Sequence, residues 1–167
     1  MFHSSRSNVT RQLAVADGGR TAELWVRADV PGGSNDRQER LHERARDVGA
    51  FEAVSTRLVP NRLSLSGLPA ETPSGAALRD LAVDARRWAA DADVELDPYL
   101  PIATESPLAS TDERRVLTFP SVVLLERDAD GIAHVTPHVD GERVVSVESR
   151  LEALSSTTER RVVTTEP

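Results

Sequence analysis

The stretch that decides the fold runs from Leu117 to Glu126 and reads LTFPSVVLLE. Pro120 precedes a continuous aliphatic run from Val122 to Leu125. Proline cannot donate a backbone hydrogen bond and is tolerated at the first position of a strand, and an unbroken aliphatic run is typical of a strand that is buried on both faces. We therefore predict a central buried strand within residues 115–127, around which the other elements are arranged.

The residues that follow this strand predict a hairpin and a short helix. The turn signal Asp128-Ala-Asp-Gly131 separates the strand from a partner over residues 132–139. Ser146 is placed to cap a helix that carries Val147, Leu151 and Leu154 on its apolar face. Residues 155–167 are polar, and we predict a disordered tail there.

The residues that precede the central strand alternate between strand and helix patterns. Residues 21–30 alternate in polarity, as expected of a half-buried strand, and residues 72–92 have apolar positions three and four apart, as expected of an amphipathic helix. The complete prediction is a weakly ordered segment over 1–20, a strand at 21–30, a helix from 35 or 36 to 48, a strand at 51–59, a helix at 72–92, a long loop at 94–114 and a single α/β domain over 21–154.

This order, β-α-β-α-β-β-α, predicts a four-stranded mixed sheet with helices on both faces. It resembles the thioredoxin-like fold, in which a proline, commonly cis, precedes the third strand, as Pro120 does here. The main alternative is a ferredoxin-like α+β sheet, which requires a further strand between the two helices. Residues 63–66 could supply it.

The thioredoxin-like resemblance also shows a departure. The redox cysteines of that fold lie where the first strand passes into the first helix, and here that junction reads Val30-Pro31-Gly32-Gly33-Ser34. The chain contains no cysteine, which excludes thiol–disulfide exchange and cysteine metal sites.

The charge composition is unusual. All 20 basic residues are arginine, and 27 acidic residues give a formal net charge of −7. An acidic, lysine-free chain resembles proteins of salt-adapted archaea, although a genome rich in G and C would also favour arginine. Hydrophobic residues make up 39% of the chain, enough for a core, and no segment has the roughly 18 apolar residues of a membrane span. We expect a cytoplasmic protein.

A second resemblance concerns two helix starts. Asp36-Arg37-Gln38 and Ser146-Val147-Glu148-Ser149 are similar to segments of small haloarchaeal proteins that are labelled as helix-turn-helix domains. This resemblance implies regulation.

Two sites for an anion or a nucleic acid are candidates. Arg37, Arg40 and Arg44 share one helix face and could contact phosphate, but pairs such as Asp36 with Arg40 would instead make a solvated, salt-bridged surface. Gly32, Gly33 and Ser34 could hold an anion at a helix start. The thioredoxin-like resemblance adds Pro120 to that ligand-binding site.

The remaining candidates are aromatic or metal-binding. His134 and His138, with Asp140, have the side chains for zinc, but two histidines under-specify a site and no metal is predicted. Trp88 is expected in the core, and Trp25 is expected under a helix. No catalytic residue and no cofactor is predicted.

The sequence favours a non-catalytic binding or regulatory protein whose partner is a protein or a small anion. The alternatives are a DNA-associated regulator that uses the arginine face, and an anion-binding protein that uses Gly32 to Ser34.

Overall fold

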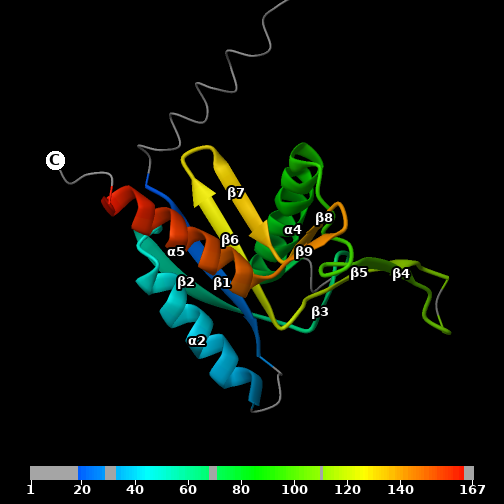
Figure 1. The fold of residues 1–167 in the computed structure, drawn as a ribbon. Helices are drawn as coiled ribbons and strands as arrows, with labels where there is room; N and C mark the ends of the chain where they lie inside the picture. The colour runs from blue at the N-terminus through cyan, green and yellow to red at the C-terminus, as the bar shows by residue number, and fades with distance from the viewer. Residues whose placement is uncertain (1–18, 29–32, 68–70, 110, 164–167) are drawn as a thin grey trace, which may run out of the picture.

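The computed structural model describes residues 19–28, 33–67, 71–109 and 111–163. Within these ranges the chain forms three helices and nine strands, and the strands are arranged in three sheets (Figure 1). The elements are β1 (Thr21–Arg27), α2 (Gly33–Asp47), β2 (Ala53–Val59), β3 (Arg62–Ser64), α4 (Pro73–Ala92), β4 (Ile102–Glu105), β5 (Arg114–Thr118), β6 (Val122–Asp128), β7 (Gly131–Thr136), β8 (His138–Asp140), β9 (Arg143–Val145) and α5 (Val147–Val163).

The main sheet has the strand order β2-β1-β6-β7. Strand β1 pairs in parallel with β2 and antiparallel with β6, and β6 pairs antiparallel with β7. The predicted α/β class and the four-stranded mixed sheet are confirmed, and the strands of this sheet follow the predicted order with α2, α4 and α5. The additional strand β3 joins β5 and β4 in a separate sheet, so the ferredoxin-like alternative is not the arrangement that the chain adopts.

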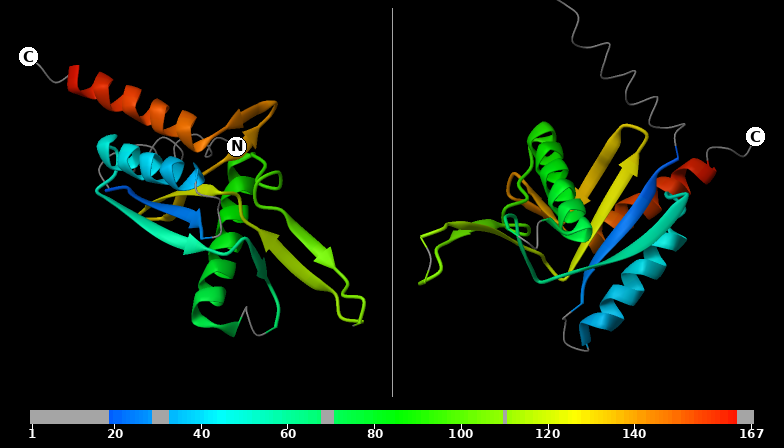
Figure 2. Two further views of the ribbon diagram at one scale, coloured as in Figure 1. Left: turned by 90° about the horizontal axis from the view of Figure 1, so that it is seen from below. Right: turned by 180° about the vertical axis from the view of Figure 1, so that it is seen from behind.

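Helices cover both faces of the main sheet, as the sequence predicts (Figures 1 and 2). On one face, Leu24 and Leu124 pack with Leu41 of α2 and Leu151 of α5. On the other face, strand residues that include the fully buried Trp25 pack against α4. Thr72 caps α4 by accepting a hydrogen bond from the Gly75 amide at 3.0 Å, which confirms the predicted helix start.

The predicted central strand is divided in two at Pro120. Strand β5 belongs to the small sheet and β6 to the main sheet. The Phe119 amide donates to the Asn61 carbonyl, whereas the Ser121 carbonyl accepts from Arg27; Pro120 between them has no amide hydrogen to continue either ladder. The Phe119–Pro120 bond is trans, and among the described residues the cis bond is Thr136–Pro137.

The small sheet β3-β5-β4 occupies part of the predicted long loop. Strands β4 and β5 extend away from the main sheet (Figure 2). Leu63 and Leu117 connect the small sheet to the core under α4, together with the buried Leu100 of the preceding segment. The segment 94–114 is therefore partly strand, because β4 pairs with β5, while Leu96 and Leu100 of the same segment pack into the core.

The last helix is longer than predicted. The start is as expected, since Ser146 and Ser149 cap each other through reciprocal amide-to-hydroxyl hydrogen bonds of 3.0 and 3.1 Å. The helix α5 then continues to Val163, where the sequence predicted a disordered tail from residue 155. Four successive Ser and Thr hydroxyls, at positions 155–158, donate to carbonyls one turn earlier and so satisfy their polar groups within the helix.

Candidate ligand site at the β7 edge

The predicted anion site falls only partly within the described residues. Gly32 lies outside them, and Gly33 and Ser34 begin α2. Ser121, which follows Pro120, contacts the first turns of α2: the Arg37 guanidinium donates to its hydroxyl and the Gln38 amide donates to its carbonyl, both at 3.0 Å. The Pro120 junction and the start of α2 therefore lie together, and an anion at Gly32 to Ser34 stays a prediction.

The predicted arginine face is directed in part at α5. Arg37 Nε donates to a Glu148 carboxylate oxygen at 2.7 Å. That hydrogen bond outweighs burial and lowers the pKa of Glu148, aided by the charges of Arg37 and Arg44. Arg40 and Arg44 are exposed. The expected pairing of Asp36 with Arg40 does not occur among the ion pairs between described residues. Arg37, through Glu148, stabilises a contact between α2 and α5.

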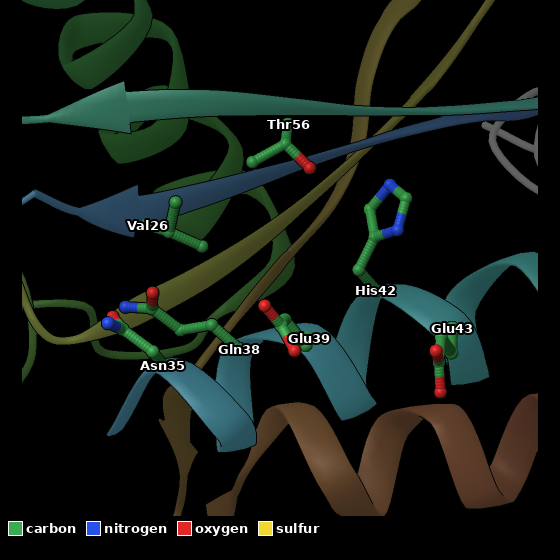
Figure 3. A pocket seen from close by; sticks show the side chains of 7 residues that line it. All are labelled: Val26, Asn35, Gln38, Glu39, His42, Glu43 and Thr56. Atoms are coloured by element: carbon green, nitrogen blue, oxygen red, sulfur yellow. The ribbon is translucent and has the colours of Figure 1, made fainter. Parts of the chain in front are cut away.

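A cavity of about 400 Å³ lies between α2 and the edge strand β2 (Figure 3). The His42 ring points from α2 towards β2, near Thr56 (Figure 3). Glu39 and Glu43 also line this α2–β2 cavity, and its lining contains no arginine. No sequence motif indicates this cavity, since its residues come from separate segments of the chain.

A fully buried glutamate lies near the opposite edge of the sheet. Alternation along β6 directs Val122, Leu124 and Glu126 towards the face under α5. Arg150 of α5 donates to both Glu126 carboxylate oxygens, at 2.7 and 2.9 Å, and Arg20 donates to one of them at 3.3 Å. Burial raises the pKa of Glu126, but the hydrogen bond from Arg150 and the nearby positive charges lower it below its ordinary value. Glu126 is therefore ionised and fixed in place.

Three rings cluster beside this ion-pair group. His134 of β7 lies opposite Glu126 in the strand register. Ring centroids are 5.1 Å apart for Trp88 and His134, 5.6 Å for Trp88 and His138, and 5.1 Å for the two imidazoles. Trp88 Nε1 donates to the Ala133 carbonyl at 3.0 Å, and His138 Nδ1 lies 2.7 Å from the Val135 carbonyl oxygen. A carbonyl only accepts, so His138 carries a proton on Nδ1.

His134 is neutral at neutral pH. Burial lowers its pKa to about 4, and the positive charges of Arg150 and Arg20 act in the same direction against the opposing charge of Glu126. Its Nδ1 is buried and has no hydrogen-bond partner among the described residues. The ring therefore contributes an uncharged aromatic surface.

The three rings and Arg150 line a cavity of about 460 Å³, which we call the β7-edge cavity. It is bounded by α4, the strands β7 to β9 and the first turns of α5. Its lining residues are Trp88, Ala92, Val94, His134, His138, Asp140, Arg143, Val144, Val145, Ser149, Arg150 and Ala153. The volume lies in the range of small-molecule sites. The wall combines apolar and aromatic side chains with the polar side chains of Asp140, Arg143, Ser149 and Arg150.

The zinc interpretation gains no third ligand from the structure. His134 and His138 do come together, and Asp140 lines the same cavity. However, no group of three or more potential ligands able to hold a metal ion occurs in the part of the chain that the structure describes.

A family model described as a helix-turn-helix domain matches residues 15–159 of the chain. The chain belongs to this helix-turn-helix domain family. No curated protein and no solved structure matches it, so kinship with the thioredoxin-like fold remains a prediction. The resemblance of the two helix starts to proteins with this label is supported.

In this member of the helix-turn-helix domain family, strands separate α2, α4 and α5 from one another along the chain. None of these three helices follows another directly, so together they do not form the consecutive helix pair that docks in a DNA groove. The matched residues 15–159 contain the whole lining of the β7-edge cavity. Over the described residues, no helix is both long and apolar enough to span a membrane.

Proposed function

We propose that the protein is a non-catalytic regulatory protein that responds to a small ligand bound in the β7-edge cavity. Family membership supports a regulatory role. The observation that supports ligand binding is the cavity itself. Its wall contains the rings of Trp88, His134 and His138 next to Arg150, which an ion pair with Glu126 fixes in position. Arg150 is fixed by its two-point contact with Glu126, and rigid polar groups bind ligands without a large ordering cost.

The same contacts argue against catalysis at this place. Both carboxylate oxygens of Glu126 accept hydrogen bonds from arginines, which leaves that carboxylate poorly suited to act as a general base. Trp88 and His138 already donate their N–H groups to backbone carbonyls. The polar groups of Glu126, Trp88 and His138 are therefore already engaged within the protein, and the cavity is better suited to binding a ligand than to catalysis.

The test is a thermal-shift screen of small metabolite classes at fixed ionic strength, repeated with a variant whose cavity is filled. Ala153→Phe places a ring into the cavity from an exposed position on α5, and Ala90→Phe adds the same ring on α4 outside the lining. A stabilising ligand should raise Tm in the wild type and in Ala90→Phe but not in Ala153→Phe. Equal shifts in all three proteins would place the ligand elsewhere.

DNA association is a second candidate, and family membership favours it. Arg40 and Arg44 are exposed on α2, where phosphate could reach them. The net charge of −7 opposes binding, so affinity must come from a local patch and must fall as salt rises. The test is anisotropy with a labelled duplex over a range of salt concentrations. Absence of binding at the lowest salt in which the protein stays folded would reject DNA association, and unchanged affinity in Arg40→Gln/Arg44→Gln would reject these two arginines as the contact.

A further inference from the structure

The β7-edge cavity is locally cationic in an acidic protein. Arg20, Arg143 and Arg150 are the guanidinium groups in and immediately behind its wall, and they face two carboxylates, Glu126 and Asp140. His134 is uncharged at neutral pH, because its pKa is about 4. The lining therefore has two arginines, Arg143 and Arg150, against one carboxylate, Asp140, whereas the whole chain carries −7, and this local excess favours an anionic ligand over a cationic one.

Arg143 is the arginine available to such a ligand. Arg150 and Arg20 already donate to Glu126. Arg143, in contrast, is exposed on β9 and takes part in no ion pair between described residues. A guanidinium presents two parallel N–H groups that match the two oxygens of a carboxylate.

The aromatic and small side chains of the cavity wall favour a flat ligand. Because Trp88 Nε1 and His138 Nδ1 bind backbone carbonyls, these side chains offer mainly ring surface. Ala92 and Ala153 line the cavity with small side chains and leave space beside the rings. The cavity of about 460 Å³ has room for on the order of fifteen non-hydrogen atoms at the volume per molecule of liquid water.

From these features we infer that the β7-edge cavity binds a small aromatic carboxylate, with its ring against Trp88 and His134 and its carboxylate on Arg143. This inference rests on the proposed function, since it names the ligand class of the same cavity. Arg143 is the cationic group of the lining that is not engaged with Glu126, and the Ser149 hydroxyl already donates to the Ser146 carbonyl. A single guanidinium matches the one charge of a carboxylate, whereas a phosphate group carries up to about two charges and three acceptor oxygens. The carboxylate is therefore the better match.

The experiment compares four probes by calorimetry at constant ionic strength: benzoate, benzamide, cyclohexanecarboxylate and inorganic phosphate. Benzoate should bind most tightly, because benzamide lacks the charge and cyclohexanecarboxylate lacks the flat ring. Arg143→Gln should weaken benzoate binding about tenfold and leave benzamide unchanged. Arg46→Gln, which removes an exposed arginine far along α2, should leave benzoate binding unchanged.

Variants of Trp88 test the contact between this side chain and the ring of the ligand. Trp88→Phe keeps a flat ring and should retain most of the benzoate affinity, whereas Trp88→Leu should lose about tenfold. Arg143 lies on an exposed strand, so its variant tests the inference even if Trp88→Leu does not fold. Benzamide or phosphate binding as tightly as benzoate would overturn the ligand class while leaving a ligand-binding function in place. Failure of every probe, with no hit in the broader screen, would overturn both.

Discussion

The cavities at the two edges of the main sheet differ in the sign of their charge. The α2–β2 cavity has two carboxylates, Glu39 and Glu43, and no arginine in its lining. The β7-edge cavity has two arginines and a single carboxylate. The two carboxylates of the α2–β2 cavity are exposed on α2 and stay hydrated, whereas Glu126 behind the other cavity is fully buried and must be paired. The comparison indicates that the buried acid Glu126 is what fixes Arg150 in the wall of the β7-edge cavity.

The largest expected effect is the loss of this buried acid. Glu126→Ala leaves Arg150 and Arg20 without their shared partner in a poorly solvated position, and breaking a buried ion pair in this way costs about 3–5 kcal/mol. The measurement is the free energy of unfolding in denaturant. Glu43→Ala, at the exposed edge cavity, is the control and should change it by no more than about 0.5 kcal/mol.

A double variant sharpens this test. Replacing both Glu126 and Arg150 by leucine removes the charges together and should recover much of the lost stability, since apolar replacements of buried ion pairs are often neutral. If Glu126→Ala costs no more than its control at the other edge, the buried ion-pair group does not organise the β7 edge.

A smaller effect is expected from pH. Burial lowers the pKa of folded His134 from 6.5 to about 4, so between these values the unfolded chain binds more protons than the folded one. Stability should therefore fall as pH is lowered through this window, by at most about 1.4 kcal/mol for each pH unit. His134→Gln should flatten the slope.

The pH range in which His134 affects stability differs from the range in which the carboxylates do. Glu126 and Glu148 have lowered pKa values in the folded protein, so their contribution is present above the ordinary carboxyl pKa of 4.5 and is lost as pH falls below it. Unfolding should therefore be followed from pH 6.5 to 5. An unchanged slope in His134→Gln would show that the ring is not held in its neutral form by the fold.

The sequence predicts the elements of the main sheet better than the contacts between residues that are distant along the chain. Periodicity identifies β1, α2, β2, α4 and the β6–β7 hairpin because each signal lies within one segment. The ion-pair group is different: Arg20 and Arg150 lie 106 and 24 residues from Glu126, and no local pattern reports such a contact. Glu126 did carry one signal, as an acid that directly follows a buried aliphatic run. Trp88 was expected in the core, and it packs there in part while also lining the cavity.

The smallest expected effect concerns the contact between α2 and α5, which runs between the two edge cavities. Arg37 and Glu148 form a 2.7 Å ion pair, but both side chains are about two-fifths exposed, and such pairs contribute about 0.2–1 kcal/mol. In a double-mutant cycle with Arg37→Ala and Glu148→Ala, we expect a coupling near the middle of that range at low salt. The coupling should disappear at about 1 M salt, where the screening length falls to about 3 Å.

Arg40→Ala replaces Arg37→Ala in the control cycle and should show no coupling to Glu148, since Arg40 is exposed on the same helix without an ion pair to a described residue. A coupling that persists in high salt would mean that the ion pair of Arg37 with Glu148 is shielded from solvent, as the pair of Arg150 with the buried Glu126 is.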